Sequence, residues 1–101
     1  MQKEQFFNTI DKATIDGCVV GNFEGRFENK SVLIFFCGSL NEPKYYAFSS
    51  FDYENVKEEG TDSELYFEDF YEALNKFKID GKPVIEQIDK MKSCQFIDYI
   101  D

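Results

Sequence analysis

Carboxylates are the reactive groups that this sequence supplies in greatest number, and nearly half of them fall in one stretch. Residues 52–72 contain nine acids and one lysine, so this acidic segment carries −8 of the formal net charge of −9. The nine acids are Asp52, Glu54, Glu58, Glu59, Asp62, Glu64, Glu68, Asp69 and Glu72. Like charges gathered in this way repel one another and project a negative field that attracts basic partners and disfavours nucleic acid.

Aromatic side chains accompany the acids of this segment, among them Tyr53, Tyr66 and Tyr71. Several must enter the core, but an exposed tyrosine beside carboxylates is a typical anchor of a protein interface. The predicted partner-binding residues are therefore Asp52, Tyr53, Glu54, Glu58, Glu59, Asp62, Glu64, Glu68 and Asp69. The alternative is that the acids only keep an aromatic-rich domain in solution.

The groups needed for ordinary catalysis are missing. The chain has no histidine, which removes the commonest general base near neutral pH and the commonest transition-metal ligand. Gly17, Gly21 and Gly25 are spaced by four, unlike the glycine patterns that cradle phosphates. No CxxC pair is present for zinc, and the acids at 52–54 and 62–64 are too sparse for a calcium loop. We therefore expect a protein that is not an enzyme and needs no cofactor or metal.

Three cysteines, Cys18, Cys37 and Cys94, are widely spaced and lie among apolar residues. This pattern is typical of reduced, buried thiols in a cytoplasmic protein, and a Cys18–Cys37 bridge between neighbouring strands is the competing prediction. The longest apolar run, Val32–Cys37, is far shorter than the roughly 18 residues of a membrane-spanning helix. The N-terminal residues lack the features of a secretory signal, so we expect a cytoplasmic location and no membrane binding.

The spacing of apolar residues predicts the elements that must position these groups. Residues 2–13 show one narrow apolar stripe and are predicted to be helical. Residues 15–27, with three glycines among apolar residues, suit a bent or bulged strand. A turn at 28–31 leads to a central strand at 32–37, whose unbroken apolar run indicates that both faces are covered. A turn at 38–43 then leads to a third strand at 44–51.

The second half is predicted to contain two helices. Residues 52–63 are polar and are predicted to form a loop. A helix beginning near Ser63 or Phe67 follows from the apolar spacing of residues 67–77. A shorter helix follows 80–83, with Asp80 as its cap and Pro83 in its first turn. Residues 94–100 are predicted to form a closing strand or an apolar tail that docks on the sheet.

Together these elements predict one compact α+β domain over residues 1–101. It has an N-terminal helix, an antiparallel meander of three or four strands, two C-terminal helices packed on one face, and a closing C-terminal strand as an option. A chain of 101 residues lies within the usual range for a single domain, and its twelve Phe and six Tyr can fill one core.

The function that the sequence favours is that of a small acidic inhibitor that neutralises a basic protein. Carboxylates on a folded scaffold can replace phosphates against Lys and Arg, as in a nucleic-acid mimic that occupies the channel of a nucleic-acid-handling enzyme. By analogy of size and charge, anti-CRISPR-like phage proteins and toxin-immunity proteins are the two types considered. We expect no direct binding to nucleic acid.

The alternative from another class is a structural or assembly module whose acids serve solubility only. Exposed strand edges at Lys44–Phe51 or Cys94–Ile100 could pair across a two-fold axis and form a homodimer.

Overall fold

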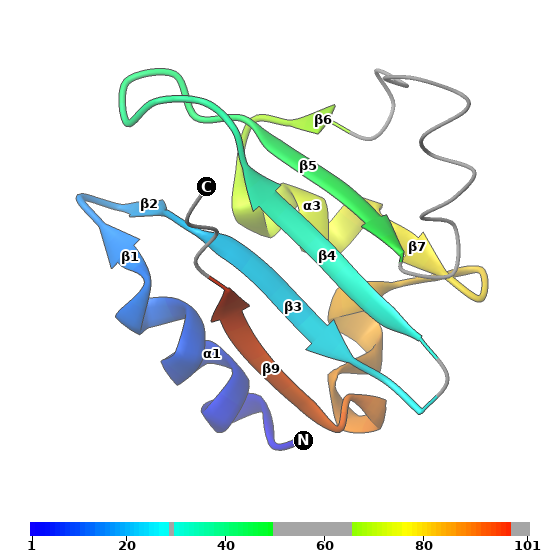
Figure 1. Cartoon of the computed structure of the whole chain (residues 1–101). Coiled ribbons are helices and arrows are strands. Elements are labelled where there is room, and N and C mark those ends of the chain that lie inside the picture. Colours follow the sequence, from blue (N-terminus) through cyan, green and yellow to red (C-terminus); the bar gives the residue numbers. More distant parts are fainter. Residues whose placement is uncertain (29, 50–65, 98–101) are drawn as a thin grey trace.

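A computed structural model describes residues 1–28, 30–49 and 66–97 of the chain, and Figure 1 shows its arrangement. It is a small α+β fold with an N-terminal helix, antiparallel sheets and a C-terminal helix. With the labels of Figure 1, the elements are α1 (Lys3–Lys12), β1 (Thr14–Ile15), β2 (Cys18–Val19), β3 (Asn22–Arg26), β4 (Ser31–Phe36), β5 (Tyr45–Ser49), β6 (Tyr66–Phe67), α3 (Phe70–Lys76), β7 (Lys78–Ile79), β8 (Lys82–Pro83), the 3-10 helix η3 (Val84–Lys90) and β9 (Ser93–Ile97).

Within the described residues, five antiparallel strands form the main sheet in the order β6-β5-β4-β3-β9. β3, β4 and β5 follow one another, with Phe23 opposite Ile34 and Ile34 opposite Ala47. β9 pairs with the other edge of β3, where Phe96 lies opposite Phe23. The antiparallel meander and the closing strand are confirmed over these residues, and the sheet has more strands than the three or four expected.

Of the two strand edges proposed for a homodimer, one is partly covered in this sheet and the other lies at the end of the strand order. β5 is an inner strand at its start, because β6 pairs with Tyr45 and Tyr46. The predicted free edge at Lys44–Phe51 is therefore covered there, whereas β9 lies at the end of the strand order. Residues 50, 51 and 98–100 of the two proposed edges lie outside the described residues.

Residues 15–27 do not form the single bent strand that the glycines suggested. Asp16 and Gly17 both adopt positive φ, at 51° and 80°, and join β1 to β2 in a tight turn. Two consecutive positive φ values match the right-handed twist of the flanking strands, and an Asp-Gly pair tolerates them well. The run is therefore divided into the small hairpin β1–β2 and the longer strand β3.

The helix predicted to begin at Ser63 or Phe67 begins at Phe70. Tyr66 and Phe67 instead form β6, because they pair with Tyr46 and Tyr45 at the sheet edge. Asp69 has an extended backbone, and its side chain accepts hydrogen bonds from the N–H groups of Tyr71 and Glu72. This cap satisfies two of the N–H groups that a helix start leaves unpaired, so α3 begins directly after it.

The prediction that Asp80 caps the second C-terminal helix is wrong. Asp80 and Gly81 adopt φ values of 53° and 81° and form the turn of the hairpin β7–β8, the second Asp-Gly turn of the chain. Pro83 stands immediately before η3 and not within its first turn. The helix itself is present, but as a 3-10 helix with non-helical dihedral angles at Gln87.

One core lies between the inner face of the sheet and the helices, and α3 and η3 lie behind the sheet in Figure 1. Phe23 of β3 is fully buried and makes edge-to-face contacts with Phe6 of α1, Phe70 of α3 and Phe96 of β9. Edge-to-face packing suits the charge distribution of aromatic rings and allows many rings to fill one space. The many Phe residues therefore produce a core in which the ring of Phe23 connects β3 with α1, α3 and β9.

The outer face of the sheet carries a second group of aromatic side chains. Tyr46 lies 4.7 Å from Tyr66 and 5.4 Å from Phe48 between ring centroids, and Phe48 lies 5.2 Å from Phe35. Phe48 is only 4% exposed although it is not part of the main core cluster. The unbroken apolar run of β4 is explained by these two faces, because Ile34 faces the core and Phe35 the aromatic layer.

The three cysteines are free thiols, so the competing prediction of a Cys18–Cys37 bridge is wrong. Cys18 and Cys94 are half-buried, but Cys37 is exposed, contrary to the expectation of burial. Cys37 directly follows β4, where the chain leaves the sheet, and its thiol donates a hydrogen bond to the carbonyl of Lys44.

Candidate partner-binding site

Most of the predicted partner-binding residues lie outside the residues that the structure describes. These are Asp52, Tyr53, Glu54, Glu58, Glu59, Asp62 and Glu64. Glu68 and Asp69 are described, and so is Glu72, the last acid of the acidic segment. All three lie where the chain passes from β6 into α3, so the sheet and the core anchor the C-terminal end of the segment.

The three described acids have different surroundings. Glu68 is exposed and makes no ion pair with another described residue. Asp69 is also exposed, but its carboxylate caps α3 through two backbone N–H groups at 3.1 and 3.2 Å. Glu72 forms an ion pair of 3.3 Å with Lys76. Exposed pairs of this kind contribute about 0–1 kcal/mol and are easily exchanged for another cation. Of these three described carboxylates, Glu68 is thus the most available to a partner.

A groove of about 700 Å³ lies beside these acids, and we call it the β6 groove. It is lined by Cys37, Lys44, Tyr66, Phe67, Glu68 and Glu72. A neighbouring hollow of about 470 Å³ shares Lys44 and Glu68 with it and adds Asn41, Glu42 and Pro43. Carboxylates beside a tyrosine ring suit a guanidinium or ammonium group, because the ring face adds a cation–π attraction to the ion pair.

The β4–β5 loop forms one wall of the β6 groove and is held by its own hydrogen bonds. The N–H of Cys37 donates to the carbonyl of Lys44 at 2.8 Å, and Ser39 and Glu42 exchange two backbone hydrogen bonds. A Cβ at Gly38 would come 2.3 Å from the carbonyl oxygen of Glu42, so only glycine fits this turn. The sequence predicted a turn at 38–43 but gave no sign that Glu42 and Lys44 would line one hollow with Glu68.

Burial changes the titration of two groups around this site. It raises the pKa of the Cys37 thiol above its ordinary value of 9.0, although nearby Lys44 partly opposes the change. Cys37 is therefore protonated at neutral pH and is a poor nucleophile. Burial, followed by the negative charges of Asp11 and Asp69, raises the pKa of Tyr71. Tyr71 is 37% exposed and stacks against Phe7 at 6.4 Å, so it extends the aromatic surface along α3.

Across residues 1–28, 30–49 and 66–97, no group of three or more His, Cys, Asp or Glu side chains is placed to hold a metal ion. No helix within these ranges is both long and apolar enough to cross a membrane.

Comparison with protein-family models, with curated proteins and with solved structures found no match to this chain. A functional proposal therefore depends on the chain's own residues.

The cap at Asp69 and the exposed carboxylate of Glu68 lead to a first prediction. Asp69→Ala should lower the free energy of unfolding by about 1 kcal/mol, because two N–H groups of α3 lose their acceptor. Glu68→Ala is the matched control and should change stability by less than about 0.5 kcal/mol, since Glu68 lies on the surface. Urea unfolding followed by circular dichroism measures both. Equal losses in the two variants would contradict the separate roles given to these acids.

Proposed function

We propose that this protein binds a basic protein partner through its acidic segment and thereby inhibits it. The observation that carries the proposal is the charge of residues 52–72, a segment that contains nine acidic residues and one lysine. Such a concentration of charge disfavours folding through self-repulsion, and attraction of a basic partner is a function that uses it.

The partner we propose is an enzyme or toxin that handles nucleic acid. A cleft that binds nucleic acid is lined by Lys and Arg that neutralise phosphates. Carboxylates on a folded scaffold can occupy those same side chains without the ordering of a flexible polyanion. The protein would then act as a nucleic-acid mimic of the anti-CRISPR type, or as an immunity protein that covers a toxin's cleft, and it would do so without catalysis.

The β6 groove supplies a place for one basic side chain of that partner. An Arg or Lys entering the groove meets the exposed carboxylate of Glu68 and the ring of Tyr66. Lys44 also lines the groove, so an incoming cation meets one ammonium group there as well. Because Glu72 is held only by a surface ion pair, it can also contribute to the contact.

Two charge-reversed variants of equal net charge test this proposal. The first carries Glu58→Lys, Glu59→Lys, Asp62→Lys and Glu68→Lys, and the second carries Glu4→Lys, Asp11→Lys, Glu28→Lys and Glu86→Lys. The four acids of the second set are exposed and lie outside the acidic segment. Both variants change the formal net charge from −9 to −1, so they differ only in where the charge is reversed.

The wild-type chain is immobilised, and proteins retained from an extract of its native host are identified and purified. The dissociation constant of the purified partner is then measured at low and high salt, together with its activity on nucleic acid. We expect wild-type binding to weaken as salt rises. The first variant should bind at least about 100-fold more weakly, because several close charge pairs are reversed. The second should bind nearly as well as wild type.

Equal losses in the two variants would mean that bulk charge alone drives the association. Unchanged binding in the first variant would leave the acids with solubility as their role, which is the alternative that the sequence allows. A melting curve for each variant shows that it is folded under the assay conditions.

A further inference from the structure

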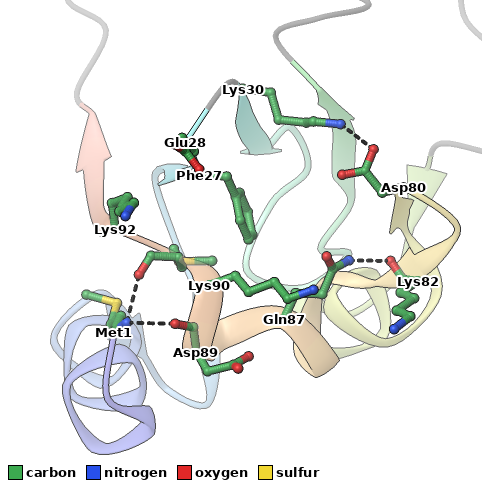
Figure 2. Close-up of a pocket in the computed structure, with 11 residues that line it drawn as sticks. Met1, Phe27, Glu28, Lys30, Asp80, Lys82, Gln87, Asp89, Lys90 and Lys92 are labelled. Atoms are coloured by element: carbon green, nitrogen blue, oxygen red, sulfur yellow. Dashed lines mark hydrogen bonds and ion pairs between the residues drawn. The ribbon is translucent and has the colours of Figure 1, made fainter.

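A second pocket, of about 720 Å³, lies at the opposite end of β4 from the β6 groove. Figure 2 shows it between the β3–β4 turn, the β7–β8 hairpin and the residues of η3 and just beyond. The side chains used below are Phe27, Lys30, Lys82, Gln87, Lys90 and Lys92. Because four of these six are lysines, we call it the lysine pocket.

The lysine pocket differs in charge from the remainder of the molecule. Four lysines and three carboxylates line it, whereas elsewhere in the chain seventeen acids outnumber seven basic residues. Lys30 is paired with Asp80 at 2.6 Å, which leaves Lys82, Lys90 and Lys92 against the remaining two acids. An anion therefore meets less repulsion here than it would over the acidic segment.

Gln87 points an amide oxygen into this pocket. Its side chain is 95% buried, and its Nε2 donates two hydrogen bonds of 2.9 Å, to the carbonyls of Ile79 and Lys82. These bonds determine which end of the amide is nitrogen, since the flipped amide would set its oxygen against two carbonyl oxygens. No described residue donates to Oε1, which Figure 2 shows directed toward the space beneath Phe27.

This oxygen is open to the pocket, so a ligand that brings an N–H or O–H group can donate a hydrogen bond to it. The ring of Phe27 is half-buried and extends along the wall of the pocket in Figure 2. The pocket thus combines ammonium groups, a hydrogen-bond acceptor and a flat apolar wall.

We propose that the lysine pocket binds a nucleoside monophosphate. Its phosphate would contact the ammonium groups of Lys82 and Lys90, a donor group of the nucleoside would reach Oε1 of Gln87, and its base would lie against Phe27. The volume of the pocket is within the range typical of small-molecule sites. This inference does not depend on the proposed partner binding, because its residues lie outside the acidic segment.

Nuclear magnetic resonance titration of the ¹⁵N-labelled wild-type chain tests the inference with three probes. These are adenosine 5′-monophosphate, adenosine and inorganic phosphate. We expect the monophosphate to shift the backbone signals of Phe27, Lys82 and Gln87 and the side-chain amide signal of Gln87. Adenosine and phosphate should each bind about tenfold more weakly or worse, because each lacks one set of contacts.

A double substitution, Lys82→Gln with Lys90→Gln, removes two charges from the pocket at exposed positions. Its matched control, Lys3→Gln with Lys12→Gln, removes two exposed charges on α1, outside the lining of the pocket. The monophosphate should bind the first variant about tenfold more weakly or worse and the control nearly as well as wild type. Equal weakening in both variants, or the absence of shifts at Phe27 and Gln87, overturns the proposal. So does a response to phosphate equal to that of the monophosphate, which would show that only an anion is recognised.

Discussion

Phe23→Ala is expected to lower the free energy of unfolding by about 3–5 kcal/mol, the largest loss predicted for this chain. Phe23 is fully buried, and its ring centroid lies within 6 Å of those of Phe6, Phe70 and Phe96. The substitution therefore removes the ring that joins α1, β3, α3 and β9 and leaves a cavity in its place. A domain of this size has a stability of about 5–15 kcal/mol, so most of it could be lost.

Urea unfolding monitored by circular dichroism measures this effect. Leu40→Ala is the control, because Leu40 is 50% exposed and its truncation should change stability by less than about 0.5 kcal/mol. A loss below about 1 kcal/mol in Phe23→Ala would mean that the core tolerates the cavity, against the packing described above.

Tyr45→Phe is expected to cost about 1–3 kcal/mol, although it removes only one oxygen atom. Tyr45 is 2% exposed, and its hydroxyl donates a 2.7 Å hydrogen bond to the carbonyl of Val19. The thiol of Cys18 lies 3.2 Å from the same hydroxyl, within hydrogen-bond distance. The substitution leaves the Val19 carbonyl without this donor and releases β2 from β5. Tyr66→Phe is the control, since Tyr66 is only half-buried and its hydroxyl bonds no described residue.

Tyr45 is also expected to make the folded protein less stable at alkaline pH. Burial, followed by the interaction with the neighbouring Cys18 thiol, raises the pKa of Tyr45 above its ordinary value of 10.0. The unfolded chain therefore releases this proton at a lower pH than the folded chain, and stability falls as pH rises above about 10. Tyr45→Phe should show a weaker decline than wild type when melting temperatures are compared between pH 9 and pH 11. Parallel curves would contradict this role.

Some buried positions could be predicted from the spacing of apolar residues alone. Phe6 and Ile10 share a stripe one helical turn apart, and both are fully buried on α1 as that spacing predicts. The apolar run of β4 likewise indicated a strand covered on both faces. Asp16-Gly17 and Asp80-Gly81 form hairpin turns, although the spacing of apolar residues around them predicted a bulged strand and a helix cap. Each Asp-Gly pair is a local signal for a hairpin turn, but the longer apolar patterns around it favoured another prediction.

Two other features had no local signal. Tyr66 and Phe67 continue the apolar spacing of α3, and only pairing with β5 makes them a strand. Pairing supplies their backbone groups with partners, and the cap at Asp69 then allows the helix to begin one turn later. The lysine pocket joins Phe27 to Gln87, which are sixty residues apart, and no sequence pattern relates them.

The amino-acid sequence by itself determined the composition of the core, the order of most helices and strands, and the concentration of negative charge in residues 52–72. These follow from side-chain chemistry and from periodicity along the chain, both of which act over short distances. The tertiary structure alone decided that β9 pairs with β3, that Glu42 and Lys44 line one hollow with Glu68, and that Gln87 lines one pocket with lysines from separate elements. Such contacts form between segments that are distant in the sequence and pack on one core. The residues of one segment alone therefore do not predict them.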